Sequence, residues 1–222
     1  MIACPSASIR KILFICLLLQ SPMPFANTAY PKGRIAISSG GGMVPIAVQL
    51  PTFTDGVLKN DLVELVNIPE NLRLSPDGDY SFDPDDDRFA FVHAYYYATQ
   101  QIAAYNKILE PLFHKHLSGV TISLSRAPDG TAPSAGGGGS RGINVSFAKP
   151  VFDISILAHE IGHEIHRLLL GKGLHEVYEF PPTDFVRFAQ QAGVIEGTAN
   201  MLAALYLGRS KIGEFDLYEC AF

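Results

Sequence analysis

The sequence predicts an α+β protein in which a β-rich section comes before a mainly helical one. From about Gly33 to Asp87, short apolar runs such as VPIAVQL and LVELVNI alternate with clusters such as SSGGG and SPDGD. Apolar runs of this length between Gly, Pro and Asp clusters are typical of strands joined by turns. After Asp87, the longer segments repeat apolar residues at helical spacing. We therefore expect a β-rich section at residues 30–87 and a mainly helical section at residues 88–222.

Composition limits the class of protein. The chain has 222 residues, of which 47% are hydrophobic, so it can bury a sizeable core as one domain or as one domain with a small appendage. Its formal net charge is −5 and it contains no basic run, which argues against a nucleic-acid partner. Beyond the N-terminal segment no stretch is long and apolar enough for a transmembrane helix. We expect a soluble mature protein.

Residues 1–29 have the pattern of a signal peptide. Arg10 and Lys11 precede the apolar run ILFICLLL, and small residues that suit a cleavage site follow it. This run is too short to span a bilayer as a helix. We therefore expect a cleaved leader and a secreted or periplasmic protein; a buried N-terminal helix is the alternative. Only Cys220 lies outside the leader, so no intramolecular disulfide is expected.

The acidic run DPDDD at residues 83–87 leads into a long helical pattern. Its carboxylates could bind calcium, but their spacing is not that of an EF-hand loop, and acidic residues favour a helix start. We prefer the helix start and predict a helix over residues 88–116, interrupted near Pro111. We assign His93 and the HKH triplet at residues 114–116 to packing or to the surface rather than to metal binding. The expected buried stripe comprises Phe91, Tyr95, Ile102, Tyr105 and Leu109.

Two strands with a loop between them are predicted next. VTISLS at residues 120–125 has strand character, and so does GINVSFAKP at residues 142–150. Residues 127–142 (APDGTAPSAGGGGSRG) are small and flexible, and side chains of this kind cannot build a packed core. We therefore expect a mobile surface loop there.

A second helix is predicted from Asp153, a suitable N-cap, to about Leu170, where Gly171 supplies a stop. His159 and His163 stand one turn apart within its motif HEIGH. The apolar face expected to pack against the core comprises Leu157, Ile161, Ile165 and Leu168.

The HEIGH motif predicts a catalytic zinc site. Imidazoles at positions i and i+4 can bind one zinc ion, and Glu160, beside the first imidazole, can act on a water molecule at that metal. Hydrolysis of a carbonyl compound needs an open zinc position for water and a carboxylate that accepts the proton. We expect His159 and His163 to be ligands and Glu160 to be the general base.

A third ligand is expected in a helix covering GVIEGTANMLAALYLG, which should end before Gly208. Glu196 lies inside this apolar helix, and a buried carboxylate is costly unless it is paired or bound to a metal. Asn200 follows one turn later, where it can hydrogen-bond a ligating histidine. The pattern that uses a third histidine does not fit, because Leu169 occupies that position. The alternative ligands are His175, Glu176, Glu179 and Asp184, and a further alternative is that Glu196 is an ordinary surface-exposed glutamate.

These segments together resemble the gluzincins, and specifically the thermolysin-like and fungalysin-like metallopeptidases. The resemblance covers roughly residues 60–208 and rests on FAFVHAYYYATQQI, INVSFAKP, LAHEIGHEIH and IEGTANMLAALYLG. It implies a zincin-like fold, a polypeptide substrate and hydrolysis of peptide bonds. It also implies zinc held by His159, His163 and Glu196, with Glu160 as the base.

The chain departs from that family in two places. The family usually has aspartate where Asn200 stands, and asparagine brings no charge, so zinc affinity is expected to be lower. Residues 197–222 are too few for the family's second, helical domain and its oxyanion-stabilising histidine, so we expect the chain to lack them. The resemblance offers Tyr178, in the connection that also holds His175, as the donor to the substrate carbonyl. The strand before the HEIGH helix is expected to be a sheet edge that pairs with an extended peptide.

Three functions remain open at this stage. The first is an exported zinc metallopeptidase, the interpretation that we favour. The second is a truncated or impaired pseudopeptidase that binds zinc and acts as a binding module, an expectation motivated by Asn200 and by the ending LYECAF. The third is a metal-free protein in which HEIGHEIH arose by chance on a core helix.

Overall fold

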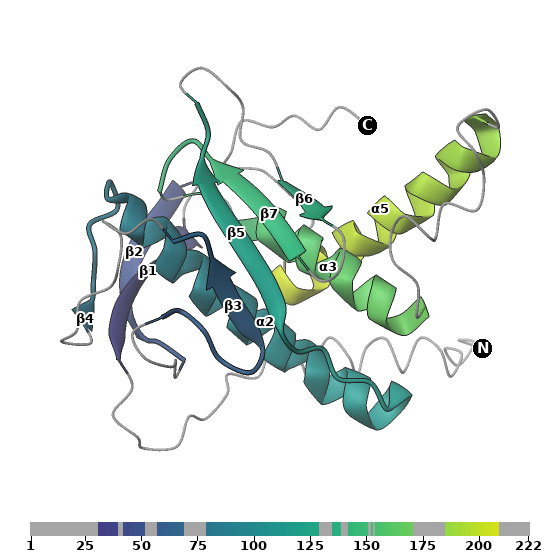
Figure 1. Ribbon diagram of the computed structural model, residues 1–222, viewed down its shortest axis with the longest axis horizontal. Coiled ribbons are helices and arrows are strands. Elements are labelled where there is room, and N and C mark those ends of the chain that lie inside the picture. The colour runs from purple at the N-terminus through teal and green to yellow at the C-terminus, as the bar shows by residue number, and fades with distance from the viewer. Residues whose placement is uncertain are drawn as a thin grey trace, which may run out of the picture.

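The protein combines three helices and two sheets among its described residues, so the predicted α+β class is confirmed (Figure 1). The computed structural model describes residues 31–39, 42–51, 57–68, 79–128, 135–138, 142–150, 152, 154–170 and 185–208. The strands are β1 (Lys32–Ser39), β2 (Gly42–Gln49), β3 (Val63–Val66), β4 (Asp79–Tyr80), β5 (Val120–Arg126), β6 (Ala135–Gly138) and β7 (Gly142–Phe147). The helices are α2 (Asp87–Phe113), α3 (Ile154–Leu170) and α5 (Phe185–Leu207).

The larger sheet has the strand order β3-β5-β7-β6. Strands β3, β5 and β7 are parallel, and β6 runs antiparallel to β7. Parallel neighbours need a crossover connection, and α2 supplies it between β3 and β5. Figure 1 shows α2 and α3 behind this sheet, and both helices contact its strands. The smaller sheet has the order β2-β1-β4 and packs against α2 through β1.

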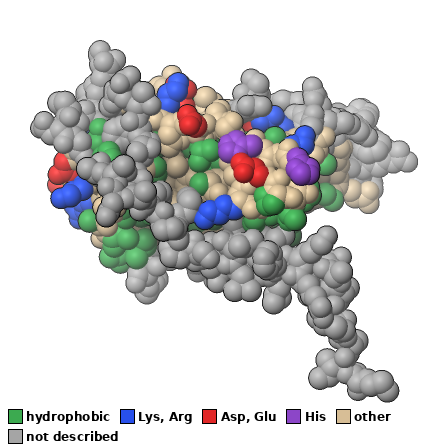
Figure 2. All heavy atoms as spheres, turned by 90° about the horizontal axis from the view of Figure 1, so that it is seen from below, with side chains coloured by type: hydrophobic (Ala, Val, Ile, Leu, Met, Phe, Trp, Pro, Cys, Tyr) green, Lys and Arg blue, Asp and Glu red, His purple; other side chains and the backbone are tan. Residues whose placement is uncertain are grey.

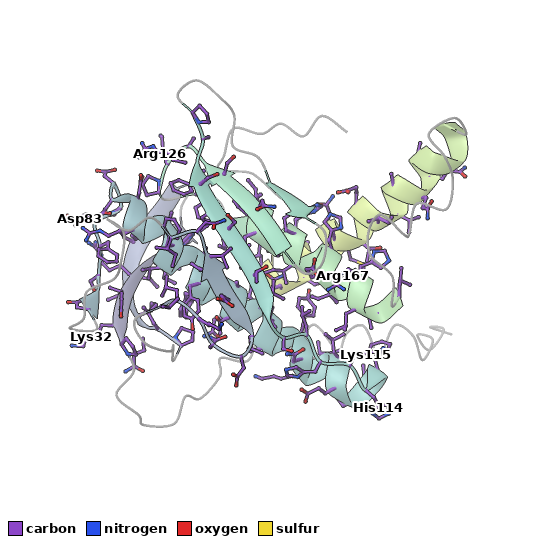
Figure 3. The ribbon with its side chains drawn as sticks, in the orientation of Figure 1. Lys32, Asp83, His114, Lys115, Arg126 and Arg167 are labelled. Atoms are coloured by element: carbon purple, nitrogen blue, oxygen red, sulfur yellow. The ribbon has the colours of Figure 1, made fainter. Side chains whose placement is uncertain are left out.

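The acidic run at residues 83–87 begins α2, as predicted. Asp86 is the N-cap, and its Oδ1 accepts a hydrogen bond of 2.9 Å from the backbone N–H of Arg88. Asp87 lies in the first turn and pairs with Arg126 of β5. Arg126 and Asp83 lie at the same end of the molecule (Figure 3). Carboxylates here serve the positive end of the helix and nearby arginines.

The predicted interruption of α2 near Pro111 is wrong, because the helix continues to Phe113. It ends at His114, which adopts a left-handed conformation with φ of 53°. The N–H of His114 then donates to the carbonyl of Glu110 at 3.1 Å. Proline removes its own N–H bond and its ring crowds the carbonyl four residues earlier, and only two helical residues follow Pro111. The predicted stripe of Phe91, Tyr95, Ile102, Tyr105 and Leu109 is buried throughout.

The predicted mobile loop at residues 127–142 is wrong in part, because Ala135–Gly138 form strand β6. Its register with β7 runs from Ala135 opposite Val145 to Gly138 opposite Gly142. Pairing of strands uses backbone N–H and C=O groups, so a glycine-rich segment needs no side chains to join a sheet. Strand β7 therefore lies inside the sheet, and the edge beside it is β6, contrary to our expectation that the strand before the HEIGH helix is an edge.

One hydrophobic cluster contains buried residues from the larger sheet and from helices α2 and α3. It includes Leu65 of β3, Ile122 of β5, Tyr95 of α2 and Ile161 of α3, so residues from both predicted sections share a core. The division at residue 87 stays a prediction. Among the described residues no helix is long and apolar enough to cross a membrane. The predicted leader at residues 1–29 lies outside the described residues.

Candidate metal centre

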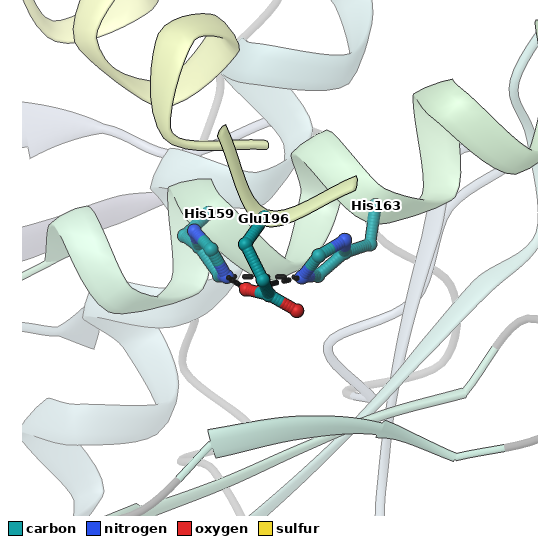
Figure 4. A group of neighbouring side chains, drawn as sticks. All are labelled: His159, His163 and Glu196. Atoms are coloured by element: carbon teal, nitrogen blue, oxygen red, sulfur yellow. Dashed lines mark hydrogen bonds and ion pairs between the residues drawn. The ribbon is translucent and has the colours of Figure 1, made fainter. Parts of the chain in front are cut away.

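Helix α3 carries the HEIGH motif and packs against strands β6 and β7 of the larger sheet. Its apolar face is buried as predicted: Leu157, Ile161 and Ile165 are almost inaccessible, and Leu168 packs against the core partly buried. This packing fixes the rotation of the helix about its axis. His159 and His163 therefore project together from another face, as Figure 4 shows. The predicted N-cap, Asp153, lies outside the described residues.

Helix α5 brings Glu196 to the two histidines. Glu196 Oε2 lies 3.1 Å from His159 Nε2 and 3.4 Å from His163 Nε2. The two Nε2 atoms are 2.9 Å apart. Figure 4 shows all three side chains converging on one point from two helices. Glu196, the residue expected to be the third ligand, thus lies beside both histidines. Helix α5 begins at Phe185, earlier than the segment predicted from the sequence.

The glycine of the motif explains how α5 comes so near. A Cβ atom built on Gly162 would lie 2.9 Å from both Cα and the carbonyl oxygen of Ala199. Any side chain at residue 162 would therefore push against the backbone of α5. Our sequence reasoning missed this contact. A glycine inside a well-formed helix costs stability and often marks a close approach of another backbone, so it was the available clue.

The three atoms fit zinc. In a tetrahedral site with bonds of about 2.0–2.2 Å, the ligand atoms stand roughly 3.3–3.6 Å apart. The separations of 2.9, 3.1 and 3.4 Å are close to these values. Two imidazole nitrogens with one carboxylate oxygen also form a donor set that zinc prefers. Three protein ligands leave a fourth position for water or substrate.

The surroundings of His163 lower the pKa of its imidazole. Burial, assisted by the imidazole of His159, lowers the pKa of His163 to about 4, while the carboxylate of Glu196 opposes this shift. His163 is therefore neutral near pH 7. Neutral imidazole is the form that binds a metal.

Asn200 fixes the tautomer of His159. Asn200 Oδ1 lies 2.8 Å from His159 Nδ1, and an amide oxygen can only accept a hydrogen bond. Nδ1 is therefore the donor in this bond, and Nε2 is the ring nitrogen that faces Glu196. This is the arrangement that a metal-ligating histidine needs, and it agrees with the role predicted for Asn200.

The site is open to solvent on the side of α5. The side chain of Glu196 is 40% exposed, whereas those of His159 and His163 are 15% and 6% exposed. Figure 2 shows histidine and acidic side chains side by side in the middle of one face of the molecule. Glu160, the predicted base, lies next to His159 on α3 and is itself buried. A substrate could thus approach the convergence point from outside.

Other predicted candidates lie elsewhere. His93 is fully buried, where its Nδ1 accepts from the N–H of Ala36 and its Nε2 lies 3.2 Å from the carbonyl of Phe152. This confirms a packing role. His114 and Lys115 lie at the end of α2 (Figure 3), and His116 pairs with Glu110. Across the described ranges, His159, His163 and Glu196 are the one group of such side chains with converging ligand atoms. The following candidates lie outside the described residues: His175, Glu176, Tyr178, Glu179 and Asp184.

Comparisons with models of protein families, with curated proteins and with solved structures found no match.

Proposed function

We propose that the protein is an exported zinc-dependent metallopeptidase with a zincin-like fold, similar to the gluzincins. One observation carries this proposal: His159 Nε2, His163 Nε2 and Glu196 Oε2 converge within 3.4 Å of one another. Residues far apart in the sequence thus supply the donor set expected from HEIGH and a downstream glutamate. The neutral state of His163 and the tautomer of His159 support the same conclusion.

Each proposed site residue has a separate role in the hydrolysis of a peptide bond. His159, His163 and Glu196 would hold zinc, which when bound polarises the substrate carbonyl and lowers the pKa of water to about 7. Glu160 takes a proton from the attacking water and gives it to the nitrogen of the leaving peptide. One water is consumed, one C–N bond is broken, and a carboxyl and an amine are released. Tyr178 is our candidate for the hydrogen-bond donor to the carbonyl oxygen, a role whose loss costs roughly 100- to 1000-fold in rate.

A polypeptide in extended conformation is the substrate that suits the surroundings. Among the described strands, β6 is the edge of the larger sheet, and it lies against α3, which carries the motif. An edge strand can pair with the main chain of a peptide. Such pairing would align a peptide bond beside the site without demanding particular side chains.

The proposal is tested by measuring zinc content and cleavage of an unstructured protein such as casein. We expect about one zinc per chain and cleavage that stops on chelation. Glu160→Gln should keep the zinc and lose nearly all cleavage, because an amide cannot accept the proton. Glu110→Gln, at an exposed glutamate on α2, is the matched control and should retain both.

The outcomes separate the competing functions. Equal cleavage by wild type and Glu160→Gln would refute catalysis by this site. Stoichiometric zinc with no cleavage by the wild type would favour the pseudopeptidase, a binding module that holds zinc without hydrolysis. A chain with no zinc would leave only a packing role for the HEIGH helix.

A further inference from the structure

Helix α2 bonds to both helices that carry the metal-site residues. Gln101 and Tyr105 stand four residues apart on α2, so they share one face of the helix. Gln101 reaches α3 and Tyr105 reaches α5. Neither residue lies near the motif in sequence, and neither contributes a ligand atom.

Tyr105 holds α5 by its hydroxyl and its ring. Its OH donates to the carbonyl of Leu202 at 2.5 Å, and its ring centroid lies 6.5 Å from that of Tyr206. Tyr105 is 3% exposed, so little water competes for this bond. A hydroxyl on a ring with two side-chain torsions loses little conformational freedom on bonding, which suits a fixed anchor.

Gln101 holds α3 directly before the first histidine. Its Nε2 donates to the carbonyl of Ala158 at 3.0 Å, and His159 is the next residue. Gln101 is 1% exposed. A buried amide without a hydrogen-bond partner is costly, so this bond resists displacement of α3.

We propose that Gln101 and Tyr105 are positioning residues that set α5 against α3 and thereby place Glu196 beside His159 and His163. Gly162 permits the close approach of α3 and α5, which contact each other extensively. The two bonds from α2 add a fixed hydrogen-bond partner for each helix. This inference rests on the zinc site proposed above. It goes beyond the HEIGH motif because it gives a role to residues of α2, a helix that carries none of the proposed zinc ligands.

A purely structural role predicts something different. Loss of a buried hydrogen bond anywhere in α2 would lower stability without changing the geometry of the ligands. Tyr95 provides the matched case: it is buried on the same helix, and its hydroxyl accepts a bond of 2.7 Å from Asn60 Nδ2. Tyr95→Phe therefore removes one hydroxyl from α2 at a place where neither α3 nor α5 is the partner in that bond.

The test measures zinc affinity of the full chain by competition with a chelator, together with urea unfolding of the zinc-free proteins. Tyr105→Phe and Gln101→Met should each lower zinc affinity about 10-fold, the lower end of what loss of a hydrogen bond made directly to a metal ligand costs. Tyr95→Phe should lose stability similarly and keep wild-type affinity. In a Glu196→Ala background, Tyr105→Phe should cause no further loss, because the ligand it positions is gone.

The results distinguish this inference from the proposed function. A wild-type chain that holds no zinc would overturn both. Zinc binding by the wild type, with Tyr105→Phe or Gln101→Met equal to Tyr95→Phe, would overturn only the positioning role. An undiminished effect of Tyr105→Phe in the Glu196→Ala background would also overturn it, since the hydroxyl would then act by some route other than Glu196.

Discussion

Gly162 of α3 faces the backbone of Ala199 of α5 with no room for a side chain, since a Cβ atom at residue 162 would lie 2.9 Å from Ala199 Cα. The contact falls within HEIGH on one helix and three residues after Glu196 on the other. It therefore joins the two halves of the candidate metal centre.

The first prediction concerns this contact. Gly162→Ala should force the helices apart, cost about 1–3 kcal/mol through overpacking, and weaken zinc binding because Glu196 moves with α5. Gly193→Ala is the control: nothing lies within 4 Å of a Cβ there, so it should raise stability by about 0.5–1 kcal/mol and leave affinity unchanged. Urea unfolding and zinc titration measure both effects. Tight zinc binding by Gly162→Ala would show that the contact does not control the site.

The second prediction concerns stabilisation by metal. Zinc at 100 times its Kd should stabilise the fold by about 2.7 kcal/mol, which raises Tm by roughly 5–10 °C for a chain of this size. His163→Ala should abolish the rise, whereas His114→Ala, at an exposed histidine, should keep it. Calorimetry with and without zinc makes the comparison. A rise in Tm that survives His163→Ala would place the zinc elsewhere.

The third prediction concerns the residue behind His159. Asn200→Ala removes the bond to Nδ1 and should lower zinc affinity by about 10- to 100-fold. Asn200→Asp keeps an acceptor and adds a negative charge, so affinity should rise above that of the wild type. Chelator competition ranks the three proteins. The order Asp, Asn, Ala is expected, and an Ala variant that matches the wild type would contradict the hydrogen bond's role.

The fourth prediction separates structural from ligating histidines. His93→Leu leaves the N–H of Ala36 and the carbonyl of Phe152 buried and without this partner, which should cost about 2–5 kcal/mol. Zinc stoichiometry should not change in the folded fraction. Denaturant unfolding and metal analysis test the two parts. Loss of zinc from a folded His93→Leu protein would refute the assignment.

The sequence could predict those parts of the site that follow from local geometry. The spacing of His159 and His163 places both on one helical face. The prediction of Glu196 as their partner assumed a buried carboxylate; its side chain is 40% exposed instead, but it lies beside both histidines as expected. Asn200 follows by the same one-turn spacing. These three inferences needed no knowledge of how α3 and α5 pack, and the distances in the site agree with them.

The remaining features depend on tertiary contacts that no local pattern encodes. The stripe on α2 was predicted as core, but the hydroxyl of Tyr105 on Leu202 and the amide of Gln101 on Ala158 appear only when three helices are assembled. Strand β6 was missed because its glycines carry no hydrophobic pattern, and backbone pairing with β7 decides its structure. The extension of α2 through Pro111 was missed because proline usually interrupts a helix, whereas here two more helical residues follow it.

The most direct measurement is X-ray diffraction from zinc-loaded crystals at the zinc absorption edge. We predict one anomalous peak about 2.0–2.2 Å from His159 Nε2, His163 Nε2 and an oxygen of Glu196. A peak bound by other side chains, or no peak at these three residues after loading with zinc, would contradict it.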